Sequence, residues 1–165
     1  MKKALFCLSL TLVLAGCATV SKPVPDDYKG PIVQLSDTGM REDGSKGQFF
    51  VATEIDGNAI QNALRETRGA SYGQGFSLNS RYTTRDIPVR PMKIKLVATH
   101  QTAAPIHEMA SRMAGTFFSI DGVVDFKPTE GHRYEVAGEL KKERSCVWIL
   151  DAESKQPATE KVCSK

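Results

Sequence analysis

Short segments in which apolar and polar residues alternate recur along this chain, and such alternation predicts half-buried β-strands. The clearest case is 92–100, in which Met92, Ile94, Leu96 and Ala98 occupy one face and lysines the other. Alternation, or a run of aromatic and β-branched residues, predicts further strands over 32–35, 48–55, 116–126, 132–140, 146–150 and 159–163. In 116–126, Asp121-Gly122 suggests a β-bulge.

Two segments instead repeat apolar residues at helical spacing. Asn58 is a candidate cap for a helix over 58–68, which a glycine follows. A proline begins a second helix over 105–114, whose apolar residues follow an i, i+3, i+4, i+7 pattern: Ile106, Met109, Ala110 and Met113.

The remaining segments read as loops and turns. Residues 38–47 are turn-rich, 81–90 are basic and irregular, and the turns at 127–131 and 141–144 are short enough to join antiparallel strands. We therefore expect a mainly β domain, a β-sandwich-like antiparallel sheet with one or two short helices, with an α+β fold as the alternative. Trp148, the one tryptophan, is expected in the core.

The first 17 residues have a different pattern. Two lysines precede an apolar run over 4–13, which is shorter than the about 20 residues that cross a bilayer and is typical of a secretory signal peptide. The run ends in Leu14-Ala15-Gly16-Cys17, which resembles the bacterial lipobox, where cleavage falls before the cysteine.

This resemblance implies that Cys17 carries a diacylglycerol and an acyl chain such as palmitate on its amine. Because Ala18 rather than an aspartate follows the cysteine, the resemblance also implies the outer membrane. An ordinary secreted protein that is cleaved nearby is the alternative.

The chain then divides into a signal peptide over 1–16, a lipidated flexible tether over 17–31, and a single periplasmic domain over 32–165. Three prolines and a glycine favour an extended tether. The mature chain would have 149 residues (165 less 16) and a net charge of +1, because two of the 22 basic residues leave and all 19 acidic residues remain. A charge so close to zero gives no reason to expect nucleic acid as a partner.

Two cysteines remain besides Cys17. Cys146 and Cys163 are an even pair in an oxidising compartment and lie in β-type segments, so we expect a disulfide across a hairpin, with Leu150 opposite Thr159. Such a bond closes a loop of about 17 residues and contributes ~3 kcal/mol in the chain-entropy model. Two free thiols are the alternative, and no His or third Cys lies at the spacing of a metal site.

One stretch carries local positive charge. It contains five basic residues against Asp86 alone, and these are candidate contacts for an anionic ligand or partner: Arg81, Arg85, Arg90, Lys93 and Lys95. Lipid A phosphates, a peptidoglycan carboxylate or an acidic protein would fit such a surface. The alternative is a solvated loop and strand face.

No constellation of residues points to catalysis. His100, His107 and His132 lack metal-ligand spacing, and no serine stands in a G-x-S-x-G setting. We therefore expect no catalytic residues, no metal and no cofactor, and hence a protein that is not an enzyme.

These observations favour a binding or accessory module that is lipid-anchored in the outer membrane, faces the periplasm and contacts an envelope protein or glycan. One alternative is a glycan- or lipid-binding module with an aromatic and basic groove, whose rings would be Phe49, Phe50, Tyr72, Phe76 and Tyr82. An envelope hydrolase is the other. Segments 131–138 and 146–151 look like those of small periplasmic β-sandwich lipoproteins of unknown function.

Overall fold

The structure, a computed structural model, describes residues 19–164. The predicted signal peptide over 1–16 and the predicted lipidation site Cys17 lie outside this range. Within the range, no helix combines the length and the apolar character that a bilayer crossing requires.

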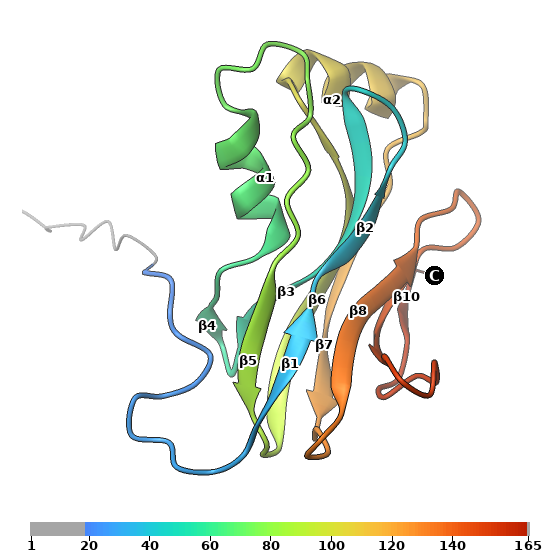
Figure 1. The fold of residues 1–165 in the computed structure, drawn as a ribbon. Helices are drawn as coiled ribbons and strands as arrows, with labels where there is room; N and C mark the ends of the chain where they lie inside the picture. Colours follow the sequence, from blue (N-terminus) through green and yellow to red (C-terminus); the bar gives the residue numbers. More distant parts are fainter. Residues whose placement is uncertain (1–18, 165) are drawn as a thin grey trace, which may run out of the picture.

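Two β-sheets pack face to face, and two helices lie against one of them (Figure 1). In chain order the elements are β1 (Ile32–Ser36), β2 (Thr38–Arg41), β3 (Lys46–Ile55), β4 (Asn58–Ala59), α1 (Ala63–Ser71), β5 (Thr84–Pro88), β6 (Met92–Thr102), α2 (Pro105–Met113), β7 (Ser119–Phe126), β8 (Arg133–Glu139), β9 (Cys146–Asp151) and β10 (Val162–Cys163). One sheet has the order β10-β9-β8-β1-β5 and the other β2-β3-β6-β7, with β4 paired to β3. Strands β1 and β8 are parallel, and the other named pairs are antiparallel.

The main hydrophobic core lies between the two sheets. Alternate residues of each strand point into it, which is why β6 buries Ile94, Leu96 and Ala98 while Lys93 and Lys95 stay at the surface. A smaller cluster lies on the other face of β3 and contains Phe49, Val51, Ala63 and Leu78. Because α1 contributes to this cluster, β3 is buried on both faces. The expected mainly β, sandwich-like fold is confirmed.

Asp37 connects α1 to both sheets from the short link between β1 and β2. Its buried carboxylate accepts hydrogen bonds from the backbone N–H groups of Ala52 (3.0 Å) and Ala63 (2.8 Å). It also forms an ion pair with Arg85 of β5, which is itself buried. One carboxylate therefore holds β3, β5 and the first residue of α1 together.

Two segments that were expected to be loops contain strands. The pattern of 38–47 lacks alternation because β2 is a short edge strand with little burial. Gly39 is required there, since an added Cβ would lie 2.2 Å from the backbone oxygen of Gln48. In 81–90, β5 pairs with β1 and buries Arg85 and Ile87 on its inner face.

The first helix begins later than expected. Asp56 and Gly57 adopt positive φ in a tight turn, so Asn58 and Ala59 form β4 against the end of β3. Asn62 caps α1 instead, where its side chain accepts a hydrogen bond from the Arg65 N–H at 3.2 Å. The second helix begins at Pro105 as expected.

The C-terminal third differs in three details from the expectation. The pairing of β7 with β6 runs through Gly122 without a shift, so no bulge lies there. Glycine is needed for a different reason, because an added Cβ would lie 2.6 Å from Val162 Cγ1. Trp148 lies only partly buried outside the core, where Lys161 Nζ is 3.9 Å from its ring centroid. Leu150 bridges to Pro157 rather than to Thr159.

The segment that was expected to be a flexible tether contacts the domain. The Ser21 N–H donates to the Ala59 oxygen at 2.7 Å, and Ser21 forms a parallel bridge with Ile60. Further along, the Val89 N–H donates to the Pro31 oxygen at 2.9 Å. The described part of the tether, 19–31, is therefore attached to the domain at both of its ends.

Candidate docking surface at the helical end

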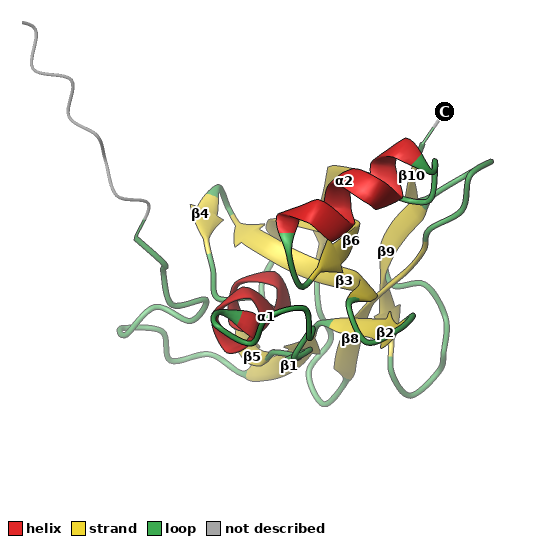
Figure 2. Ribbon diagram, turned by 90° about the horizontal axis from the view of Figure 1, so that it is seen from above, coloured by secondary structure: helices red, strands yellow, loops and turns green. Residues whose placement is uncertain are grey.

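The apolar stripe of α2 faces solvent. All nine residues Pro105–Met113 are described, and none of them is buried. Ile106, Met109 and Met113 are exposed, with Met113 at 83%. The side of α2 turned toward the domain is polar, and its partly buried residues include His107 and Glu108. Seen from above, α2 lies over the ends of β3 and β6 (Figure 2).

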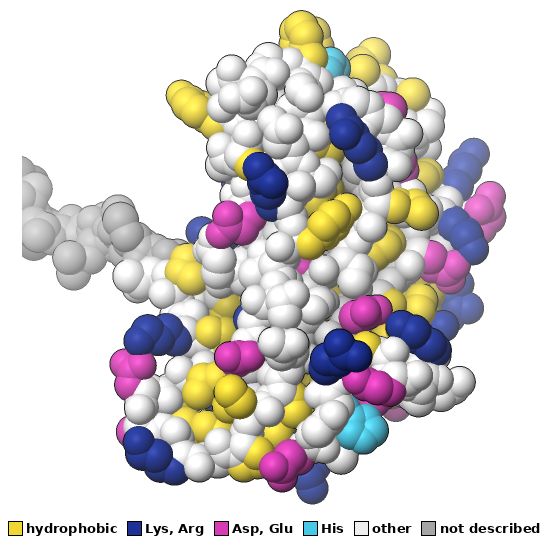
Figure 3. Space-filling view, in the orientation of Figure 1, with side chains coloured by type: hydrophobic (Ala, Val, Ile, Leu, Met, Phe, Trp, Pro, Cys, Tyr) yellow, Lys and Arg dark blue, Asp and Glu magenta, His cyan; other side chains and the backbone are white. Residues whose placement is uncertain are grey.

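Two aromatic side chains in the loop between α1 and β5 extend this apolar surface. Tyr72 is 88% exposed, and Phe76 is exposed with its ring centroid 5.1 Å from that of His107 on α2. Figure 3 shows hydrophobic side chains gathered at the top of the molecule, where this loop and α2 lie. We call the exposed apolar set the helical end: Tyr72, Phe76, Ile106, Met109 and Met113.

A cleft of about 670 Å³ opens between α1 and α2. Its floor is the outer face of β6, from which Thr99 and Gln101 contribute, and its walls include Arg68 and Tyr72 on one side and Arg112 on the other. The lining mixes polar and apolar groups. The cleft therefore offers a hydrogen-bonding channel next to the apolar surface.

The flank of the helical end is positively charged. Arg65, Arg68 and Arg81 are exposed and form no ion pair within residues 19–164. The Arg81 N–H donates to Thr67 Oγ1 at 2.8 Å, which keeps Arg81 beside α1. On α2, Arg112 is balanced by Glu108 at 2.8 Å. The uncompensated charge thus lies on the α1 side of the cleft.

The predicted basic stretch does not form one free surface. Arg85 is only 8% exposed and faces Asp37 in the interior. This corrects the expectation that Arg85 is a surface contact. Its partner Asp37 lies in the link after β1, far away in sequence, so the local pattern around Arg85 does not indicate the buried ion pair. Arg81 is the member of the set that lies beside α1, where its backbone bonds to Thr67.

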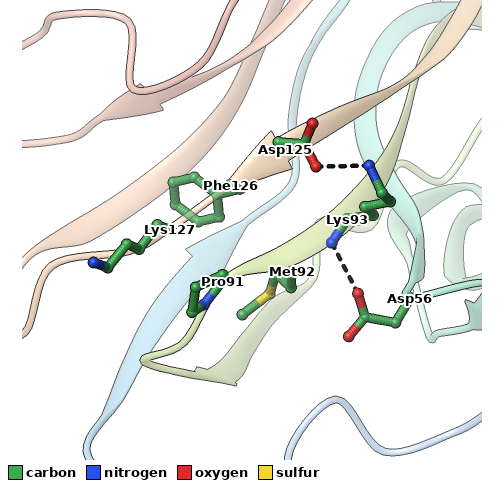
Figure 4. Close-up of a pocket in the computed structure, with 7 residues that line it drawn as sticks. All are labelled: Asp56, Pro91, Met92, Lys93, Asp125, Phe126 and Lys127. Atoms are coloured by element: carbon green, nitrogen blue, oxygen red, sulfur yellow. Dashed lines mark hydrogen bonds and ion pairs between the residues drawn. The ribbon is translucent and has the colours of Figure 1, made fainter.

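The other three basic residues of the stretch have acidic partners on β3, on β7 or in the turn after β3. Arg90 pairs with Asp56 at 2.8 Å, and Lys95 pairs with Glu54 at 3.3 Å. Lys93 Nζ lies 2.8 Å from Asp125, while its backbone N–H donates to Asp56 (Figure 4). The pocket of about 430 Å³ beside Lys93 is lined by these engaged groups and by Lys127, which forms no ion pair within residues 19–164.

The five aromatic residues proposed for a ligand groove are separated. Phe49 and Phe50 are buried on opposite faces of β3, so neither can line a surface groove. Tyr82 lies near Phe49 at a centroid distance of 5.8 Å. Tyr72 and Phe76 alone among the five belong to the helical end. The prediction of a groove lined by all five rings is wrong, because β3 is covered on both faces.

The cysteine expectation agrees with the structure. Cys146 of β9 and Cys163 of β10 are joined by a disulfide with an S–S distance of 2.13 Å, and they are direct partners in the strand pairing. The bond fixes the two-residue β10 against β9.

Three side chains that could bind a metal lie close together where β8 begins and β9 ends. The ligand atoms of His132, Asp151 and Glu153 lie within 4.8 Å of one another. Hydrogen bonds already occupy them, because the Ser154 N–H (2.8 Å) and His132 reach the Asp151 carboxylate and Arg133 reaches Glu153. The same bonds hold the pKa of Asp151 below its usual range. The cluster closes a turn, and Ser154 Oγ bonds to the carboxylate rather than to the histidine.

A second polar cluster surrounds Glu42, which lies directly after β2. Glu42 accepts hydrogen bonds from His100 Nε2 (2.9 Å) and Gln48 Nε2 (2.7 Å), and Lys46 Nζ lies 3.1 Å from its other oxygen. Partial burial works to raise the pKa of Glu42, but the hydrogen bonds outweigh it and lower that pKa. His100 Nδ1 accepts from the Phe118 N–H at 3.0 Å, so both ring nitrogens are used structurally.

Sequence reasoning missed the helical end as a site. The spacing of Ile106, Met109 and Met113 predicts a helix, but does not tell whether its stripe meets a core or solvent. No family model, curated protein or solved structure matches the chain.

Proposed function

We propose that this protein is a non-enzymatic docking module of the bacterial cell envelope. Cys17 would carry the lipid that anchors it in the outer membrane, with the domain on the periplasmic side. Its partner would be an envelope protein that presents a short segment of apolar and acidic side chains to the helical end. The observation that carries this proposal is the exposure of the apolar stripe of α2 together with Tyr72 and Phe76.

Burial of the apolar stripe supplies the favourable free energy. Covering a large apolar side chain contributes about 1.5–3 kcal/mol, and contiguous exposed apolar patches mark interaction sites. Met109 and Met113 have flexible thioether side chains that adapt to the shape of a partner. The helical end therefore suits a protein surface that must be bound without a deep pocket.

Charge supports the acidic part of the proposal. Arg65, Arg68 and Arg81 lie along α1 and the following segment with no ion-pair partner in the described chain. Carboxylates of a bound segment would pair with these guanidinium groups at the rim of the apolar contact. Charges at a rim mainly set the association rate and the choice of partner.

The test is photocrosslinking in cells with the full-length chain. A photoreactive residue in place of Met113 is compared with one in place of Val123, which is equally apolar and 58% exposed but lies on β7. We expect a discrete protein adduct from position 113 and none from 123. The adduct should disappear in Arg68→Glu and persist in Lys127→Glu.

Two results would contradict the proposal. Equal adducts from positions 113 and 123 would mean that the helical end has no preferred partner. An adduct at 113 that is insensitive to Arg68→Glu would exclude an acidic segment. Mass spectrometry of the wild type and of Cys17→Ser, which should lack the acyl groups, tests the anchor separately.

A further inference from the structure

We infer that the anchored domain is held with its β4 side against the membrane, because residue 21 is attached to the domain only four positions after Cys17. The occupant of this face is the lipid headgroup surface that holds the anchor. This inference rests on the proposed lipidation of Cys17, and it goes beyond it by assigning a membrane-facing surface and an orientation.

The attachment is a backbone pairing rather than a loose contact. The Ser21 N–H donates to the Ala59 oxygen at 2.7 Å, and Ser21 and Ile60 form a parallel bridge. Ile60 is 1% exposed and belongs to the main core, so the strand segment that receives Ser21 is fixed. Figure 1 shows the first described residues passing beside β4.

Chain geometry then limits how far the domain can lie from its anchor. An extended chain spans at most about 3.5 Å per residue, so Ser21 lies within about 14 Å of Cys17. A tether that was free up to residue 31 would reach about 50 Å. A domain of this size has a radius of gyration of about 14 Å. The short arm therefore keeps the β4 side at the headgroup layer, whereas the long one would let the domain turn freely.

The surface around Ser21 is compatible with headgroup contact. Val20 is an exposed apolar side chain, and Lys22 pairs with Asp26 at 2.7 Å. Over 19–31 two lysines stand against two aspartates, so the segment has no excess negative charge that would repel an anionic membrane. Ser21, Lys22 and Asn58 are exposed on this face, while Ala59 is partly buried. The face thus offers one apolar contact and neutral polar groups to the lipid.

The same geometry directs the helical end away from the anchor point. Ala59 pairs with Glu54 near one end of β3, whereas Thr102, just before α2, pairs with Lys46 at the other end. Eight residues of β-strand separate these positions, which is about 26 Å. Figure 1 places α2 at the top of the molecule, away from β4.

The test uses the acylated full-length chain in vesicles of phosphatidylethanolamine and phosphatidylglycerol. A fluorophore is attached to Asn58→Cys, beside Ser21, or to Lys142→Cys in the exposed turn between β8 and β9, and a quencher is attached to the lipid headgroups. We expect several-fold stronger quenching at position 58 than at 142. Ser21→Pro removes the donating N–H and should abolish this difference, whereas Ser21→Ala keeps the N–H and should preserve it.

The quenching experiment tests the orientation of the domain, and the intact mass tests the proposed lipid anchor. Acylated protein with equal quenching at positions 58 and 142, or a difference that survives Ser21→Pro, overturns the orientation and leaves the proposed anchor intact. An intact mass without acyl groups overturns the proposed anchor and the orientation with it. Thermal unfolding of Ser21→Pro and Ser21→Ala establishes that both variants remain folded.

Discussion

The two helices are equal in length but differ in how the fold uses them. α1 buries Ala63, Thr67 and Ser71, receives a side-chain cap from Asn62, and has its first N–H bound by Asp37. α2 buries none of its nine described residues and has no side-chain hydrogen bond at its cap, Ala104, within residues 19–164. α1 therefore contributes side chains to a hydrophobic core, whereas α2 lies on the surface of the domain. The proposed docking surface therefore uses the helix that contributes no buried residue.

The position of α2 is fixed by the residues on either side of it. Before it, the Ala103 N–H donates to the Ser45 oxygen at 2.8 Å. After it, Lys46 Nζ donates to the Thr116 oxygen at 2.8 Å, and the Phe118 N–H donates to His100 at 3.0 Å. These bonds hold the helix without using its apolar side chains, so the stripe stays free for a partner.

The largest expected effect comes from removing the carboxylate that fixes α1. Asp37→Ala leaves Arg85 buried without its partner and should lower the free energy of unfolding by about 3–5 kcal/mol. Urea-induced unfolding measures this loss. Asp26→Ala breaks an exposed pair with Lys22 and should cost at most about 1 kcal/mol. Equal losses in the two variants would show that α1 does not depend on Asp37.

Removing the cap of α1 and adding a cap to α2 tests the difference in stability between the two helices. Asn62→Ala removes the acceptor for the Arg65 N–H and should cost about 1 kcal/mol, while Ala104→Ser supplies α2 with a cap and should stabilise that helix by a similar amount. Hydrogen exchange of the two helices resolves the effects. A cap at residue 104 that leaves exchange in α2 unchanged would mean that α2 is already as stable as the core.

A smaller effect depends on pH. The folded protein lowers the pKa of Glu42, so the unfolded chain binds the proton more tightly and the stabilisation from Glu42 is lost as pH falls below about 4. Glu42→Gln should therefore lose less stability than the wild type between pH 6 and pH 3 in urea unfolding. Parallel curves for the two proteins would exclude a contribution of the Glu42 cluster.

The smallest change in the free energy of unfolding is expected for substitutions in the apolar stripe of α2. Met109→Gln and Met113→Gln should change the free energy of unfolding by less than about 0.5 kcal/mol, because both side chains are exposed. Leu78→Ala, in the small core under α1, should cost about 2–5 kcal/mol. A destabilisation by Met113→Gln that matches Leu78→Ala would assign the stripe to packing rather than docking.

Local patterns predicted most of the fold. The alternation in 92–100 and the spacing in 105–114 depend on neighbouring residues alone, and both elements are present as β6 and α2. β2 escaped prediction because an edge strand needs no apolar alternation. The strand that contains Phe49 and Phe50 shows a continuous apolar run, which is the sign of burial on both faces.

The site depends on contacts between distant parts of the chain. Arg85 reads as a surface charge in sequence, and Asp37, its partner, is 48 positions away. The direction in which the α2 stripe faces is decided by the anchoring of 103 and 116 on other elements. Neither fact leaves a signal in local composition.

The position of β10 has a consequence for self-association. β7 ends its sheet, and a strand at a sheet edge invites pairing with another molecule. Val162 lies directly against Gly122 of β7, and the neighbouring Cys163 is bonded to Cys146. A strand of two residues has little pairing of its own, so the disulfide keeps this cover in place. In an oxidising compartment the bond therefore protects the β7 edge against pairing with another molecule.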